Sequence, residues 1–229
     1  MRFPIAASAG VRQDSLVADV GCGSGKHCFQ VAERSGCRAI GTDLVHAPLR
    51  STVAEESNDR VQLLQGSIEQ LPIPDGSVDF VWCRDMLVHV ADLPRALWEC
   101  TRILRPAGKM LLYTTMETDL MEPREAERLY RPLAIYPLRR DALECAFDDA
   151  GLRIAKVEEI GSELIEFYEE RDGRASKRLM RIARMRRMKE QLVSAWGAER
   201  YESIEALYYW MTYLLLGKLT AAYYVLQKG

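Results

Sequence analysis

Short apolar runs alternate with segments of helical periodicity over the first two-thirds of the chain. Val78–Cys83 is a strongly apolar run, and Lys26–Ser35 has the spacing of a helix. This alternation is typical of a parallel α/β sheet whose strands are buried between helices. The expected strands are Leu16–Val20, Arg38–Thr42, Val61–Gln65, Val78–Cys83, Lys109–Thr115 and Arg153–Glu159, and the expected helices are Lys26–Ser35, Ala47–Ser57, Leu93–Leu104 and Leu138–Ala150.

The pattern changes after the sixth strand. Residues 163–216 carry helical periodicity and no clear strand, and Thr220–Gln227 then has the composition of a seventh strand. We therefore predict a single domain over residues 1–229, with a helical insertion at 163–216 that serves as a lid, a substrate-binding element or a dimerisation surface. Within it, a basic helix is expected at 174–192.

Composition limits the class of protein. The chain has 229 residues, 28% of them charged, and a net charge of −2, so it has no global attraction to nucleic acid. The six cysteines show no Cys-x-x-Cys spacing, which favours reduced thiols in a cytoplasmic protein without a metal site. The late apolar run Leu207–Leu216 is too short to span a bilayer.

A glycine loop joins the first strand to the first helix. The sequence Gly21-Cys22-Gly23-Ser24-Gly25 lets the backbone turn sharply and lets a ligand approach the main chain. Lys26 stands where dinucleotide binders carry a third glycine, and Asp19 precedes the loop. An ammonium or sulfonium ligand favours that carboxylate, whereas a pyrophosphate does not, which argues against an NAD-dependent oxidoreductase.

Asp43 follows the second strand, at the edge where ligands of open α/β sheets bind. Its carboxylate can accept hydrogen bonds from both hydroxyls of a ribose. Alternatively, it caps the helix that is expected to begin near Ala47.

Five segments in order resemble the class I S-adenosylmethionine-dependent methyltransferases, particularly the small-molecule branch with the ubiquinone and menaquinone methyltransferases. The similarity covers roughly residues 14–160. The segments are Asp19–Gly25, Gly41–Asp43, Ser67–Pro72, Asp79–Cys83 and Leu104–Lys109.

The resemblance implies a Rossmann-like, doubly wound, seven-stranded α/β sheet whose last strand is antiparallel. It also implies S-adenosyl-L-methionine as cofactor, S-adenosyl-L-homocysteine as product, and methyl transfer to O, N or C of a small molecule. Ser67 departs from the family, because an acidic residue usually holds the adenine amine there. The cofactor-binding residues implied are Asp19, Gly21, Cys22, Gly23, Gly25, Asp43, Leu44, Ser67, Ile68, Cys83, Arg84 and His89.

Arg84 and His89 are also the candidate catalytic residues. Arg84 could anchor an anionic group of the substrate or pair with Asp85 or Asp43. His89 could act as general base or pack beside the cofactor.

The methyl acceptor is the least determined feature. The segments at 116–136 and 163–216 are expected to form its chamber, and the candidate substrate residues are Tyr113, Met116, Tyr130, Tyr136 and Tyr209. The alternatives are an RNA or protein methyltransferase that docks through the basic helix 174–192, and a cofactor-binding regulator without transfer activity. A homodimer through the insertion is a further possibility.

Overall fold

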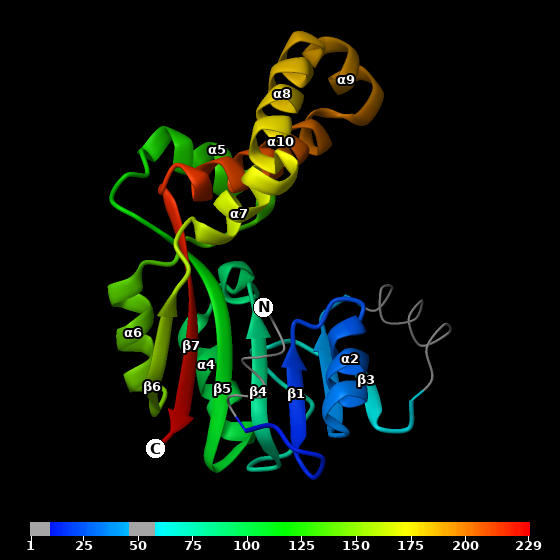
Figure 1. Ribbon diagram of the computed structural model, residues 1–229, viewed down its shortest axis with the longest axis vertical. Coiled ribbons are helices and arrows are strands. Elements are labelled where there is room, and N and C mark those ends of the chain that lie inside the picture. The colour runs from blue at the N-terminus through cyan, green and yellow to red at the C-terminus, as the bar shows by residue number, and fades with distance from the viewer. Residues whose placement is uncertain (1–9, 46–57) are drawn as a thin grey trace. The chain divides into compact units, whose positions relative to one another are not determined.

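The computed structural model describes residues 10–45 and 58–229, and its central feature is a seven-stranded sheet (Figure 1). The order β3-β2-β1-β4-β5-β7-β6 is that of a doubly wound fold with one added strand, and β7 runs against its neighbours. This confirms the predicted architecture. The strands are β1 Leu16–Val20, β2 Arg38–Asp43, β3 Val61–Gln65, β4 Val78–Arg84, β5 Leu104–Glu117, β6 Leu152–Glu159 and β7 Leu219–Lys228.

Helices connect the strands and fill the predicted insertion between β6 and β7 (Figure 1). The expected helix Ala47–Ser57 lies outside the described residues. The helices are α2 Lys26–Ser35, η1 Leu87–His89, α4 Leu93–Ile103, α5 Pro123–Leu133, α6 Arg140–Asp149, α7 Glu163–Asp172, α8 Arg174–Arg187, α9 Lys189–Trp196 and α10 Ala198–Leu215.

The chain divides into two compact units. Unit 1 contains the described part of residues 1–114 together with 141–158 and 223–229. Unit 2 contains residues 115–140 and 159–222, and thus α5 and α7–α10. The two segments that were expected to form a substrate chamber therefore belong to one compact unit.

The core of unit 1 lies between α2 and the strands β1, β2 and β4. Val17, Val31 and Ala39 pack there with the buried thiols of Cys28 and Cys37. Burial of each large apolar side chain contributes about 1.5–3 kcal/mol, which fixes the sheet beneath the glycine loop. All six cysteines are free, and only Cys145 is exposed, so most of these thiols pack as small apolar groups.

Strand β5 begins earlier than the apolar pattern predicts. Its pairing with β4 shifts between Val78–Leu104 and Phe80–Lys109, so the intervening residues of β5 bulge out. Ala107 in this bulge has a φ of 60°. Pro106-Ala107-Gly108 therefore lies in a bulge within the strand, ahead of the predicted start at Lys109.

Two features of unit 2 differ from the prediction. The first is α5, a helix that was not predicted, which begins with Pro123 and a capping box between Glu122 and Glu125. The second is a break at Met188, whose φ of −105° ends α8 before α9 begins. The prediction of one basic helix over 174–192 was therefore wrong. No helix of the described segments is long and apolar enough to cross a membrane.

Candidate functional site

The carboxyl ends of β1–β4 meet at one edge of unit 1, which we call the carboxyl edge. The parallel register places Val20 beside both Thr42 and Cys83, and it places Asp43 beside Gln65. The glycine loop after β1, the segment after β3 and Arg84 at the end of β4 therefore share this edge, as the sequence predicts.

The glycine loop is tied to β2 through its backbone. The N–H groups of Gly21 and Cys22 donate to the Thr42 carbonyl at 2.8 and 3.0 Å. Gly21, Gly23 and Gly25 have φ values of 73°, 58° and 79°, which side-chain-bearing residues rarely adopt. A Cβ on Gly21 or Gly25 would clash with Met86 or Leu63, whereas a Cβ on Gly23 would meet no atom within 4 Å. Gly23 therefore leaves its backbone open to a ligand.

Asp43 holds the glycine loop in position. Its Oδ2 accepts a hydrogen bond from the Gly23 N–H at 2.8 Å, and its Oδ1 accepts one from the Val45 N–H at 2.9 Å. A carboxylate offers about four acceptor positions, so both oxygens can still accept hydroxyl groups. The side chain of the adjacent Leu44 is exposed. The alternative role of Asp43 as cap for the helix near Ala47 involves residues outside the described segments.

Asp19 is a buried carboxyl at the end of β1. Only 7% of the residue is exposed, and its Oδ2 accepts a hydrogen bond from the Cys28 thiol at 3.6 Å. Burial raises the pKa of Asp19 to about 6, while the Cys28 hydrogen bond and the nearby Arg84 act in the opposite direction. Near neutral pH this edge therefore presents a desolvated carboxylate that a cation would stabilise.

The thiols at the edge remain protonated. Burial raises the pKa of Cys83 well above its usual value, and the neighbouring Cys22 is the main cause of the raised pKa of Cys28. Cys22 is itself buried next to Gly23. Since a thiolate is the nucleophilic form, Cys28 and Cys83 are packing groups here.

The segment after β3 is anchored to α4. The buried Glu99 accepts the Leu71 N–H at 2.7 Å, and Arg102 donates to the carbonyls of Leu71 and Ile73. The Arg102 guanidinium holds the pKa of Glu99 below its usual value, so this carboxylate stays charged. These contacts fix the loop that carries Ser67 and Ile68 to the framework of unit 1.

Ser67 and Ile68 have different environments. The Ser67 hydroxyl accepts a hydrogen bond from the Glu69 N–H at 3.1 Å, so it retains its own proton for donation. Ile68 is buried. An adenine base at this edge would therefore contact the Ser67 hydroxyl, at the position where the family that the sequence resembles usually has a carboxylate.

Arg84 contacts a residue that the sequence did not reveal. Its guanidinium lies 3.1 Å from Nε2 of His27, in the first turn of α2. Since Arg84 can only donate, His27 accepts through an unprotonated Nε2. The two residues are 57 positions apart. The only local signal was the position of His27 in the helix after the glycine loop.

The segment after β4 is strained. Asp85 has a φ of 54°, and its N–H donates to the Tyr113 carbonyl at 2.7 Å. Left-handed backbone at a side-chain-bearing residue is frequent at ligand sites. His89 follows in η1 and is exposed, which leaves its ring accessible to solvent.

The five candidate substrate residues are divided between the units. Tyr113 lies in unit 1, where its ring is 4.9 Å from that of Tyr223. In unit 2, Met116 is buried and the Tyr130 hydroxyl donates to Glu117 at 2.7 Å. Tyr136 is exposed.

Tyr209 is half-buried, with its ring 5.4 Å from that of Tyr213. Of the four candidates in unit 2, Tyr136 and Tyr209 are therefore the most accessible. The described segments contain no cluster of three or more metal-ligating side chains.

Comparison with known families agrees with this geometry. The family described as "Methyltransferase domain" matches residues 18–112, which contain the whole carboxyl edge. Residues 18–112 are therefore similar in sequence to a methyltransferase domain. The match ends before unit 2 begins.

Curated relatives cover the same region. The chain is 28% identical over 125 residues to a glycine/sarcosine/dimethylglycine N-methyltransferase of Actinopolyspora halophila, which is 53% of this chain and 22% of that protein. It is 36% identical over 104 residues to a malonyl-[acyl-carrier protein] O-methyltransferase of Serratia marcescens, which is 45% of this chain and 40% of that protein. The chain thus spans well under half the length of these relatives.

Solved structures share the fold over nearly the whole chain. Phosphoethanolamine N-methyltransferase 2 of Haemonchus contortus, in complex with S-adenosyl-L-methionine, has a TM-score of 0.76 at 19% identity, covering 99% of this chain and 51% of that one. The [4+2]-cyclase SpnF has a TM-score of 0.75 at 18% identity, covering 99% of this chain and 78% of that one. At this identity the likeness shows the fold alone, and SpnF shows that the fold also occurs in a cyclase.

Proposed function

We propose that the protein is an S-adenosylmethionine-dependent methyltransferase that acts on a small molecule. The observation that carries this proposal is the carboxyl edge, where the buried Asp19 and the carboxylate of Asp43 lie on adjacent strands and the open backbone at Gly23 lies in the loop after β1. Asp19 would suit a cationic amino group, the backbone at Gly23 would suit a ligand that contacts the main chain, and Asp43 would suit a sugar with two hydroxyls.

The residues present fit this cofactor. Asp19 and the backbone of Gly21, Gly23 and Gly25 would hold the methionine end, and Asp43 would accept the ribose hydroxyls. The remaining candidates would surround the adenine and the sulfonium. They are Cys22, Leu44, Ser67, Ile68, Cys83, Arg84 and His89.

Methyl transfer requires little acid–base chemistry from the protein. The bound cofactor supplies an activated methyl group, and the protein's task is to align the acceptor and exclude competing water. Burial raises the pKa of Asp19 to about 6 and the charge of Arg84 opposes that rise, so the carboxylate is mostly ionised at neutral pH and available for an ammonium group. His89 is exposed and could accept a proton from an acceptor that loses one early.

Unit 2 is the proposed source of acceptor specificity. It lies outside the residues that match the methyltransferase family, and it carries the accessible Tyr136 and Tyr209. The relatives' names cover N-, O- and C-methylation, so the acceptor atom differs among them.

Free cysteines favour a reducing, cytoplasmic location. A homodimer through α7–α10 stays a prediction that light scattering can check.

Substitution of Asp43 tests the cofactor assignment. In Asp43→Asn the amide keeps one acceptor oxygen but loses the charge, so affinity for S-adenosylhomocysteine in calorimetry should fall by about ten- to hundredfold. Asp92→Asn is the matched control, because Asp92 caps α4 by accepting the Arg95 N–H at 3.0 Å.

The control variant should bind the product as tightly as the parent protein does. Equal binding by Asp43→Asn, or binding of NADH in place of S-adenosylhomocysteine, would overturn the assignment. Methyl transfer to candidate amines, hydroxy acids and acyl carriers is then measured with labelled cofactor.

A further inference from the structure

Helix α8 has a buried stripe that one arginine interrupts. Ala175, Ile182 and Met185 are buried at helical spacing, and Arg178 occupies the position between the first two. This side of α8 packs against α10, and we call the contact the α8–α10 seam. Arg178 is accordingly half-buried, whereas Arg184 is exposed.

Other arginines near the seam have carboxylate partners. Arg186 pairs with Glu205 at 2.8 Å, and Arg174 pairs with Asp172 at 3.0 Å. Arg174 also stacks on Tyr168, 3.9 Å from the ring centre. The charge of each of these guanidinium groups is therefore compensated within the protein.

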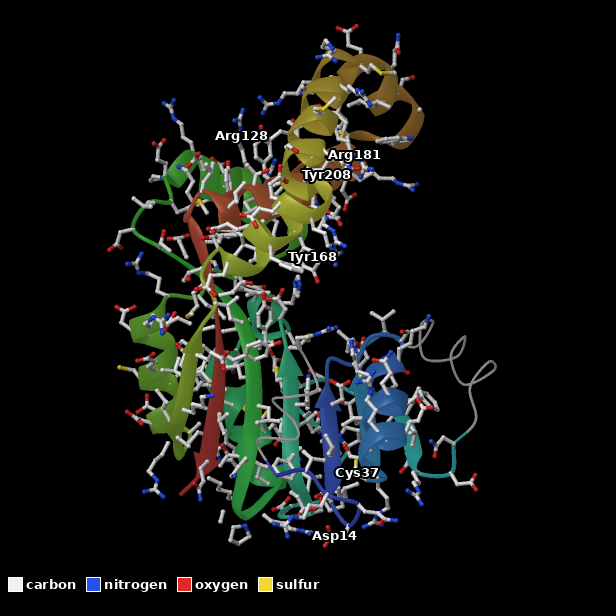
Figure 2. All side chains as sticks on the ribbon, viewed as in Figure 1. Asp14, Cys37, Arg128, Tyr168, Arg181 and Tyr208 are labelled. Carbon is white, nitrogen blue, oxygen red and sulfur yellow. The ribbon has the colours of Figure 1, made fainter. Side chains whose placement is uncertain are left out.

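Arg178 and Arg181 differ from these neighbours. Their guanidinium carbons lie 6.0 and 5.8 Å from the ring centre of Tyr208 on α10 (Figure 2 labels Arg181 and Tyr208). Within the described part of the chain, no carboxylate lies at ion-pair distance from either arginine.

The charged form of Arg178 is destabilised as a result. Burial lowers its pKa, and repulsion from Arg181 and Arg174 adds to this effect. Partial removal of a charged group from water without an oppositely charged partner is unfavourable, and a bound anion would relieve it.

We propose that Arg178, Arg181 and Tyr208 form a binding site for the phosphate group of a small molecule. Two guanidinium groups around one ring supply two positive charges and several N–H donors, and the tyrosine hydroxyl can donate as well. A phosphate monoester carries about −1.5 to −2 charges at pH 7, which matches two arginines better than a carboxylate does.

The position of Arg178 favours a small ligand over a polyanion. A nucleic-acid backbone would contact the exposed arginines of α8, such as Arg184 and Arg187. Arg178 lies instead at the packed seam, where a compact anion can reach both it and Arg181. The site lies wholly within unit 2 and does not depend on the proposed methyl transfer.

Calorimetric titration with inorganic phosphate and with glycerol 3-phosphate tests the site. Arg178→Gln should weaken binding of both by about ten- to hundredfold, because it removes charge-assisted hydrogen bonds. Arg184→Gln removes the same charge from the exposed face and should leave binding unchanged. Arg178→Lys should bind with intermediate affinity, because it keeps the charge but loses the planar fork.

The relative affinities also identify the type of occupant. Tighter binding of glycerol 3-phosphate would indicate an organic phosphate, and tighter binding of inorganic phosphate would indicate the free ion. Either result supports the phosphate site. Acetate at equal ionic strength should bind more weakly than both.

Thermal unfolding gives a readout that does not depend on the heat of binding. Phosphate should raise the Tm of the parent protein and of Arg184→Gln but not that of Arg178→Gln, whose own Tm should be no lower than the parent's. Equal weakening by Arg178→Gln and Arg184→Gln would overturn the proposal in favour of a diffuse polyanion surface, which an oligonucleotide titration would then show. Absence of phosphate binding by the parent protein would also overturn it.

Discussion

The carboxyl edge of unit 1 holds a buried carboxyl group, and the α8–α10 seam of unit 2 holds a half-buried guanidinium group. At the first, Asp19 has a thiol as hydrogen-bond donor and a pKa raised by burial. At the second, Arg178 faces a tyrosine ring and has a pKa lowered by burial. Elsewhere in unit 1 the buried Glu99 is paired with Arg102. Under the two proposals Asp19 and Arg178 would bind ligands of opposite charge, whereas Glu99 stabilises the fold.

The largest expected effect comes from Asp19→Asn. The pKa of Asp19 in the folded protein, about 6, lies above the usual value of 3.8, so this group favours folding below pH 3.8 and that contribution is lost as pH rises through 6. At pH 7 the variant should therefore be more stable than the parent by up to about 3 kcal/mol, measured by urea unfolding without ligand. Its affinity for S-adenosylhomocysteine should fall by about a hundredfold.

The same variant tests the comparison between the two regions. Asp19→Asn should leave phosphate binding at the α8–α10 seam intact, and Arg178→Gln should leave S-adenosylhomocysteine binding intact. A stability loss in Asp19→Asn would show that the carboxylate is a structural group, and the carboxyl edge would then resemble the Glu99 network.

A smaller effect is expected from Gly23→Ala. Its φ of 58° makes a side chain cost about 1 kcal/mol of folding free energy, although a Cβ would meet no protein atom within 4 Å. The added methyl group would occupy the ligand's approach to the backbone, so affinity for S-adenosylhomocysteine should fall by about tenfold or more.

Gly76→Ala is the matched control for this variant. Gly76 has a φ of 55° and equally open surroundings, so the variant should lose a similar amount of stability but no affinity. Equal affinities of the two variants in calorimetry would mean that the ligand does not approach Gly23.

The smallest effect is that of pH on the parent protein. Between pH 7 and 5 the unliganded Asp19 carboxylate becomes mostly protonated, so affinity for S-adenosylhomocysteine should fall by roughly tenfold. Sulfate, which stays doubly charged, should bind the α8–α10 seam equally well at pH 7 and at pH 5. A pH-independent affinity for S-adenosylhomocysteine would show that Asp19 does not pair with its ammonium group.

Much of unit 1 could be predicted because its elements follow local rules. The bounds of β1, α2 and β3 agree with the sequence pattern, since buried strands and glycine-bounded helices carry strong signals. The bulge in β5 was harder, because pairing with β4 already begins at Leu104, before Pro106-Ala107-Gly108, and resumes at Lys109. The resemblance of the glycine loop and Asp43 to a family then located the carboxyl edge.

The features that were missed depend on distant contacts or on weak local signals. The pair of Arg84 and His27 joins two elements 57 residues apart, which no local pattern records. The break at Met188 occurs among residues that all favour helix, so tertiary packing ends α8 there. Helix α5 did carry a signal, because Pro123 and the pair Glu122 and Glu125 mark a helix start.

The position of β7 in the sheet has a consequence for synthesis of the chain. β7 lies between β5 and β6, yet it follows helices α7–α10 in sequence. While a ribosome is still making α7–α10, β6 has no strand to pair with and the far edge of β5 stays open. Unpaired edges recruit other strands, so the nascent chain must pass through an aggregation-prone stage that ends only when β7 emerges.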